Sequence, residues 1–119
     1  MTSKELSVIF PIYNEEETIE KTLLEWKNTL DNLQISYELI LAEDGSTDGT
    51  KEILYKLLSK YENIFVPNIA EKKRGYSNAI RSSIDVAKGD YLLFLDSDGQ
   101  VESEDFIKFL DLFSAFGVK

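Results

Sequence analysis

One short run of residues limits what this chain can fold into more than any other. Tyr91 to Leu95 carries no charge and has strong strand preference, and it leads directly into two carboxylates, Asp96 and Asp98. A continuous apolar run predicts a strand buried on both faces, as in a parallel sheet. Residues two apart on extended backbone project to the same side, so Asp96 and Asp98 can converge on one ligand.

Two such carboxylates repel each other and resist burial unless a positive group neutralises them. A hard divalent cation would do so, because oxygen ligands suit magnesium, manganese and calcium. The alternative is an acidic turn that caps the next helix, and the spacing alone leaves both interpretations open.

Composition excludes several classes of chemistry and partner. The 119 residues, 43% of them hydrophobic, predict one domain with its own core. Because the chain has no cysteine and no histidine, acid–base chemistry must use carboxylates, lysine, tyrosine or bound water. A net charge of −9 argues against nucleic acid as a partner. No run approaches about 18 apolar residues and the N-terminus is too polar for a signal peptide, so we expect a cytoplasmic protein.

Hydrophobic periodicity predicts strand–helix repeated four times. Strands are expected at 6–12, 37–42, 64–66 and 91–95, with a helix after each. The first two helices have N-cap signals at Asn14, paired with Glu17 in a capping box, and at Ser46. Tyr76 and Ile84 are placed on the inner face of the third helix, and Gly89 provides its C-terminal signal. This order is typical of an α/β protein with a parallel sheet.

Polar residues follow three of the predicted strands. Ligands of such sheets bind beyond the carboxyl ends of the strands, where the strand order reverses. Three clusters fall there, and their convergence favours a binding site over surface decoration. The clusters are Tyr13-Asn14-Glu15, Glu43-Asp44 and Asp96-Ser97-Asp98.

Two further segments leave alternatives open. The loop with Lys72, Lys73 and Arg74 is either a solvated charge run or the carrier of a side chain that reaches a diphosphate. The last predicted helix, from Ser103 to near Gly117, is apolar nearly all round, which predicts that a partner chain or further polypeptide covers it.

Common ligand-binding motifs fail on spacing. An EF-hand needs a glycine where Val101 stands, or a bidentate glutamate where Tyr55 stands. The chain has no P-loop and no Gly-x-Gly-x-x-Gly after its first strand. A phosphoacceptor receiver domain is disfavoured because Asn68, not aspartate, follows the third strand.

Three segments together resemble family 2 glycosyltransferases with the GT-A fold, most closely the dolichol-phosphate mannosyltransferase type. The resemblance runs nearly end to end, with the motifs in the family's order. The segments are Val8–Glu16, Glu38–Thr50 and Gly89–Asp98.

The resemblance implies a Rossmann-like three-layer α/β/α parallel sheet with strand order 3-2-1-4. It also implies inverting transfer of a sugar from a nucleoside diphosphate donor, GDP-mannose or a UDP-sugar, assisted by Mn²⁺ or Mg²⁺. Asp44 would bind the base, Asp96 the ribose and metal, and Asp98 the metal. The positions carried over as nucleotide-sugar-binding are Pro11, Tyr13, Glu15, Ala42, Asp44, Arg74, Asp96, Ser97, Asp98 and Gln100.

The chain departs from the family pattern in three respects. Glu43 stands where the family usually has aspartate, and Arg74–Ser77 replaces a more glycine-rich loop. The family's catalytic base and acceptor-binding half lie beyond this point, so we assign no catalytic residue. We therefore expect residues 1–119 to be one donor-binding half-domain, inactive on its own.

The resemblance and the last helix also suggest partners. The acceptor would be a polyprenyl phosphate bound through the missing half, at the cytoplasmic face of a membrane. The alternative is a non-catalytic nucleotide-binding or assembly module with a partner docked on the Phe-rich last helix. That helix would also serve a homo-oligomer.

Overall fold

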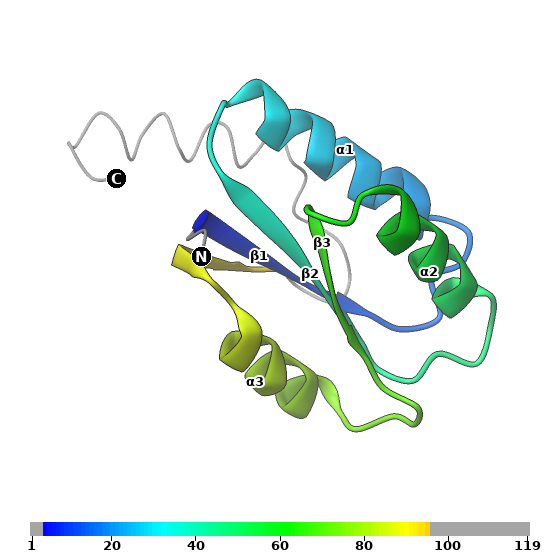
Figure 1. Cartoon of the computed structure of the whole chain (residues 1–119). Helices are drawn as coiled ribbons and strands as arrows, with labels where there is room; N and C mark the ends of the chain where they lie inside the picture. Colours follow the sequence, from blue (N-terminus) through cyan, green and yellow to red (C-terminus); the bar gives the residue numbers. More distant parts are fainter. Residues whose placement is uncertain (1–3, 96–119) are drawn as a thin grey trace.

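A four-stranded parallel sheet lies at the centre of the computed structural model, which describes residues 4–95 (Figure 1). The strand order is β3-β2-β1-β4, as the family resemblance implied. The strands are β1 (Lys4–Ile12), β2 (Tyr37–Glu43), β3 (Phe65–Ile69) and β4 (Gly89–Phe94). Between them run α1 (Ile19–Asn32), α2 (Thr50–Lys60) and α3 (Tyr76–Val86). The predicted helix at 103–117 lies outside the described residues.

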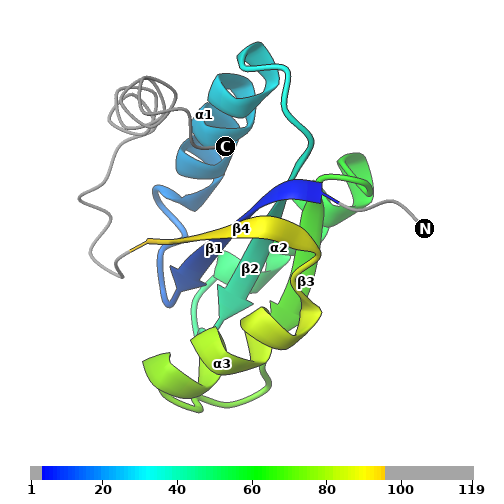
Figure 2. The same ribbon diagram turned by 90° about the vertical axis from the view of Figure 1, so that its left-hand side faces the viewer.

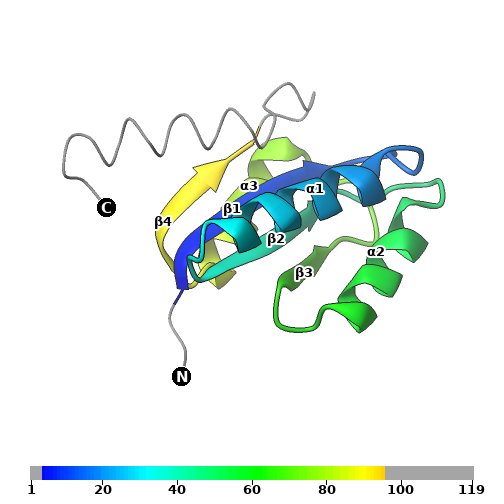
Figure 3. The same ribbon diagram turned by 90° about the horizontal axis from the view of Figure 1, so that it is seen from above.

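The helices form the two outer layers of a three-layer α/β/α arrangement. Figures 2 and 3 show α1 and α2 on one face of the sheet and α3 on the other. The larger core lies under α1 and α2, where Phe10 and Trp26 pack edge to face with ring centroids 5.8 Å apart. The apolar residues that recur at helical spacing in α1 face this core, because Ile19, Leu23, Trp26 and Leu30 are all buried. Each such side chain contributes about 1.5–3 kcal/mol through burial.

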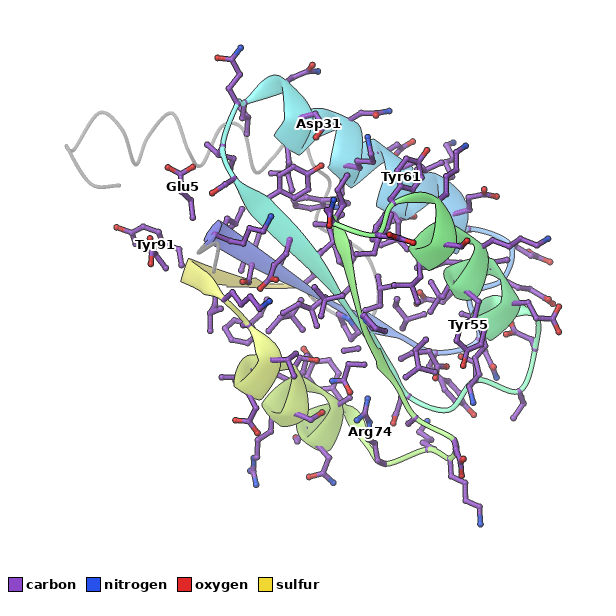
Figure 4. All side chains as sticks on the ribbon, in the orientation of Figure 1. Glu5, Asp31, Tyr55, Tyr61, Arg74 and Tyr91 are labelled. Atoms are coloured by element: carbon purple, nitrogen blue, oxygen red, sulfur yellow. The ribbon has the colours of Figure 1, made fainter. Side chains whose placement is uncertain are left out.

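The prediction that the last strand is buried on both faces is wrong for the described residues. Tyr91, Leu92 and Phe94 are 48%, 38% and 44% exposed, and Tyr91 points away from the sheet edge (Figure 4). The strand lies at the end of the four-strand order, and α3 packs on β1, β2 and β3. The seven helices and strands of the described residues therefore leave part of the apolar surface of β4 exposed.

The third helix also buries a narrower face than its periodicity predicted. Ala79 and Ser83, one helical turn apart, are buried, whereas Tyr76 and Ile84 are exposed. Small residues along the contact line let α3 approach the sheet closely, which leaves the larger side chains on its flanks.

Neither predicted N-cap caps a helix. The residues that precede α1 and α2 are Thr18 and Gly49, and neither makes a side-chain cap hydrogen bond. Asn14 has φ of 50°, a left-handed conformation that asparagine tolerates. The predicted capping box with Glu17 is therefore wrong, because the side chain of Asn14 serves a neighbouring loop instead.

Gly89 starts β4 rather than ending α3. A Cβ atom there would lie 2.5 Å from the backbone nitrogen of Ser7, so only glycine fits beside β1. Its N–H donates to Ser7 Oγ at 2.8 Å, and Ser7 Oγ donates to the buried carboxylate of Glu38 at 2.7 Å. The Lys88 N–H donates to the same carboxylate at 2.6 Å, which fixes the entry into β4.

The third strand is longer than predicted and includes Pro67 and Asn68. It stands at the edge of the sheet, where a residue without an N–H donor is tolerated. Within residues 4–95, no helix is both long enough and apolar enough to cross a bilayer.

Candidate functional site

The carboxyl ends of β1 and β2 lie side by side, and the loops that follow them run in contact. Ile12 pairs with Glu43, and the Asp44 N–H donates to the Ile12 carbonyl oxygen at 2.9 Å. The polar clusters that follow these two strands therefore share one edge of the sheet. This is the arrangement expected at the carboxyl ends of parallel strands.

Asn14 joins these two loops. Its backbone N–H donates to Ser46 Oγ at 2.8 Å, and its side-chain Oδ1 accepts the Thr47 N–H at 2.8 Å. The left-handed backbone at Asn14 turns the chain so that both bonds form at once. Ser46 is thus an acceptor for the first loop, not the predicted cap of α2.

The same loop holds the start of α2. The Glu15 N–H donates to Thr50 Oγ1 at 2.8 Å, and Glu16 Oε2 accepts the Gly49 N–H at 2.9 Å. Asp48 Oδ1 accepts the Thr50 N–H at 2.9 Å. Two carboxylates thus lie at the positive end of the α2 dipole and satisfy N–H groups that lack helical partners.

Glu43 organises the loop after β2 from inside the protein. Its carboxylate is fully buried and accepts the N–H groups of Gly45 at 2.8 Å and Ser46 at 2.5 Å. Gly45 has φ of +78°, and a Cβ atom there would lie 2.4 Å from the Lys72 carbonyl carbon. The loop therefore needs both a long buried acceptor and a glycine.

Asp44 connects this loop to the segment that leads into α3. Its Oδ1 atom accepts the N–H groups of Arg74 at 2.7 Å and Gly75 at 3.2 Å. The residue is only 7% exposed, and it lines a cleft at the edge of the sheet. One carboxylate oxygen is therefore fixed by backbone groups.

The guanidinium of Arg74 points inward. Nη1 donates to Asn68 Oδ1 at 3.0 Å and Ser82 Oγ at 3.1 Å, and Nη2 donates to the carbonyls of Glu43 and Asn68 at 3.0 and 2.9 Å. Figure 4 shows the side chain reaching from its loop back toward the sheet. Both terminal nitrogens are thus engaged within the protein.

A cleft of about 290 Å³ opens between these loops and the start of α3. Its walls come from the ends of β1 and β2, the loop before α3 and α3 itself. The lining residues are Pro11, Ile12, Tyr13, Glu15, Ala42, Asp44, Lys73, Tyr76 and Ala79.

Lys73 and Tyr13 both line this cleft and contact each other. The Lys73 ammonium lies 4.0 Å from the centroid of the Tyr13 ring, within the range of a cation–π contact. Lys73 thus lines the cleft, whereas the guanidinium of its neighbour Arg74 bonds inward.

The carboxyl of Glu15 has an unusual proton affinity. Burial, with a smaller contribution from the charge of Asp48, raises its pKa from 4.5 to about 7. The Thr50 hydroxyl, which hydrogen-bonds Asp48, holds the pKa of Asp48 below its usual range, so Asp48 stays charged near neutrality. Glu15 is therefore part-protonated at neutral pH and can either donate or accept a hydrogen bond in the cleft.

The raised pKa of Glu15 predicts that the stability of the folded chain depends on pH. Because the pKa of Glu15 is about 7 in the folded chain against an ordinary 4.5, the folded state binds more protons between these values. The contribution of Glu15 to the free energy of unfolding should therefore fall as pH rises through this window, so the folded chain becomes less stable. Glu15→Gln should flatten that slope, measured by urea unfolding between about pH 4.5 and about pH 8.

Glu17→Gln is the matched control, since it removes the same charge from an exposed position on the same loop. It should leave the pH slope as in the parent chain. Equal slopes in the parent and in Glu15→Gln would show that Glu15 titrates normally.

The described residues include no cluster of three or more acidic side chains arranged to hold a metal ion. The predicted metal ligands, Asp96 and Asp98, lie outside those residues, as do Ser97 and Gln100. The cleft is nevertheless linked to the end of β4, because the Tyr76 hydroxyl, from a residue that lines it, donates to the Leu95 carbonyl at 3.4 Å.

Five of the residues predicted for the site line one cleft, and Arg74 is not among its lining residues. Those in the lining are Pro11, Tyr13, Glu15, Ala42 and Asp44. The sequence did not predict that Ser46, Thr50 and Asn68 hold the loops in place. For Ser46 and Asn68 the available signal was their place in the segments that follow predicted strands, where polar residues gather.

The profile of the family described as "Glycosyl transferase family 2" matches residues 7–118, nearly the whole chain. The chain belongs to glycosyltransferase family 2. The match includes both loops of the cleft and every predicted site residue.

Relatives of this family 2 domain are longer proteins. It is 35% identical over 102 residues to the undecaprenyl-phosphate 4-deoxy-4-formamido-L-arabinose transferase of Photorhabdus laumondii, covering 86% of this chain and 31% of the relative. It is 34% identical over 106 residues to a dolichyl-phosphate beta-glucosyltransferase of Trichomonas vaginalis, covering 85% and 32%. The chain thus spans about a third of the length of these curated relatives.

Solved structures show the same GT-A fold. A mannosyltransferase of Pyrobaculum calidifontis in complex with GDP-Man and Mn²⁺ superposes with a TM-score of 0.61 at 20% identity, covering 82% of this chain and 30% of that one. The TarS protein of S. aureus superposes with a TM-score of 0.60 at 26% identity, covering 92% and 20%.

Proposed function

We propose that this family 2 domain is the donor-binding half of an inverting glycosyltransferase. It would bind a nucleoside diphosphate sugar for transfer to an acceptor, and two relatives named for undecaprenyl and dolichyl phosphate favour a polyprenyl phosphate. The observation that carries the proposal is the cleft in which Asp44, fixed by two backbone N–H groups, lies with Pro11 and Tyr13 at the carboxyl edge of the sheet.

The cleft residues suit a nucleoside. Pro11 and Tyr13 offer apolar and aromatic surface against which a ring can pack. Asp44 offers a carboxylate oxygen to donors of the base, and Glu15 can bond a ribose hydroxyl in either protonation state. The ammonium of Lys73 supplies local positive charge, which an acidic protein needs if it is to hold a diphosphate.

A divalent ion would supply neutralisation of the charge on the leaving diphosphate as the glycosidic bond breaks. The described cleft residues contribute two carboxylates, Glu15 and Asp44, which do not make a metal cluster. We therefore propose Asp96 and Asp98 as the oxygen ligands of Mn²⁺ or Mg²⁺, with Ser97 and Gln100 beside the donor. Their oxygen donors suit these hard cations.

Titration calorimetry tests the proposal on the whole chain. UDP and GDP are titrated with and without Mn²⁺, and at least one of the two should bind more tightly with the metal. Asp98→Asn should abolish this metal dependence, because it removes the anionic ligand, while the thermal midpoint changes little. Asp90→Asn, an exposed change of the same charge, should behave as the parent chain.

Two results would contradict the proposal. The first is that neither nucleotide binds at millimolar concentration with the metal present. The second is that Asp98→Asn retains the full metal-dependent affinity.

A further inference from the structure

A positive charge covers an aromatic ring of the cleft. The ammonium of Lys73 lies 4.0 Å from the centroid of the Tyr13 ring, and both residues line the cleft. A base that packs on this face of the Tyr13 ring would have to occupy the place of the ammonium. The free protein therefore presents a charge where the proposed function needs an aromatic surface.

The side chain of Lys73 can move while its backbone stays in place. The backbone lies against Gly45, where an added Cβ atom would stand 2.5 Å from the Lys73 nitrogen. The next residue, Arg74, is held through its N–H group, which donates to Asp44 Oδ1 at 2.7 Å. Lys73 is exposed, and within residues 4–95 its ammonium forms no ion pair. Rotation about the bonds of its side chain can therefore move the ammonium off the ring without moving the loop.

We infer that Lys73 is a side-chain gate on Tyr13, which opens when a ligand brings phosphate into the cleft. This inference rests on the proposed nucleotide-binding function. In the free protein the ammonium covers the ring. When a nucleoside diphosphate enters, the ammonium leaves the ring for the diphosphate, and the base takes its place on Tyr13. A nucleoside without phosphate must displace the same ammonium and offers it no anion in return.

The strengths of the two contacts decide where the ammonium lies. A cation–π contact at an exposed site favours the covered ring by about 2–5-fold. A charge-assisted hydrogen bond to a phosphate oxygen favours the displaced ammonium by about 10-fold or more. Among the described residues that line the cleft, Lys73 carries the one positive charge, beside the carboxyl groups of Glu15 and Asp44. A diphosphate in the cleft therefore draws the ammonium off the ring.

NMR of the whole chain, isotope-labelled at lysine Cε, tests the covered state without any ligand. Protons that lie over the face of an aromatic ring resonate at high field. The Lys73 signal, assigned by its loss in Lys73→Ala, should therefore lie at higher field than the signal of the exposed Lys72. Tyr13→Leu should move it to the ordinary position, and so should UDP or GDP with Mg²⁺ in the parent chain. An ordinary position in the free parent chain would overturn the inference.

Lys73→Ala should change the affinities for a nucleoside and for its diphosphate in opposite directions. NMR titration with Mg²⁺ compares uridine, UDP, guanosine and GDP on the parent chain and on the variant. Nucleoside affinity should rise about 2–5-fold because the ring is uncovered. UDP or GDP affinity should fall about 10-fold or more because the diphosphate loses its cationic partner. Lys73→Arg keeps the charge and should retain the selectivity of the parent chain. Lys72→Ala, the control, removes the same charge from an exposed neighbour outside the lining and should leave all four affinities unchanged.

The outcomes separate this inference from the proposed function. If Lys73→Ala weakens nucleoside and diphosphate binding alike, or if nucleoside binding to it is not detected, Lys73 is an ordinary contact and not a gate. Unchanged UDP and GDP affinities in the variant would also overturn the inference. In each of these cases the proposed function stands. If neither UDP nor GDP binds the parent chain, the proposed function fails, and this inference fails with it.

Discussion

Replacing Gly45 with alanine should destabilise the chain by about 3 kcal/mol or more. The residue has φ of +78°, and a Cβ atom would lie 2.4 and 2.5 Å from the backbone carbon of Lys72 and nitrogen of Lys73. Neither backbone atom can move without disturbing the loop that ends in Arg74. Urea unfolding followed by circular dichroism measures the loss, and Trp26 fluorescence reports on the core.

Gly75→Ala is the control for this variant. Gly75 also has a positive φ, +94°, but a Cβ atom there would meet nothing within 4 Å. Its substitution should cost only the backbone strain, about 1–3 kcal/mol. Equal losses in the two variants would show that the close approach of the two loops does not limit Gly45.

Arg74→Ala should also cost about 3 kcal/mol of stability, because it removes four hydrogen bonds from a charged donor. The carbonyls of Glu43 and Asn68 would lose partners at the ends of β2 and β3. Thermal or urea unfolding measures the effect. Arg74→Lys should restore little of it, because an ammonium lacks the planar fork that reaches both strands and α3.

Arg81→Ala, an exposed arginine on α3, is the matched control and should change stability by less than about 0.5 kcal/mol. If Arg74→Ala unfolds like the parent chain, the guanidinium does not hold the loop against the sheet.

The fold could be predicted because its signals are local and periodic. The stripe of Leu23, Trp26 and Leu30 indicates one buried helix face whatever that face packs against. Helix starts were missed because an asparagine before an apolar run looks the same whether it caps its own helix or bonds another loop. Asn14 bonds residues more than thirty positions away, and no local pattern contains that partner.

The site could be predicted in outline because the carboxyl ends of parallel strands share an edge. This places residues near Pro11 and Asp44 together before any coordinates are known. The direction of a long side chain does not follow from the same rule. Lys73 and Arg74 are neighbours with similar charge, yet one lines the cleft and the other bonds the ends of β2 and β3.

The hydrogen bonds that hold the loops of the cleft in place have a consequence for affinity. Asn14, Glu43 and Asp44 tie three loops together through bonds that exist before any ligand arrives. These loops lose little conformational freedom when a nucleotide binds to them. The entropic cost of association therefore comes mainly from ordering the ligand and Lys73. Calorimetric entropies should therefore be less unfavourable than for a cleft whose loops must first become ordered, and amide exchange at Thr47 and Gly75 should already be slow in the free protein.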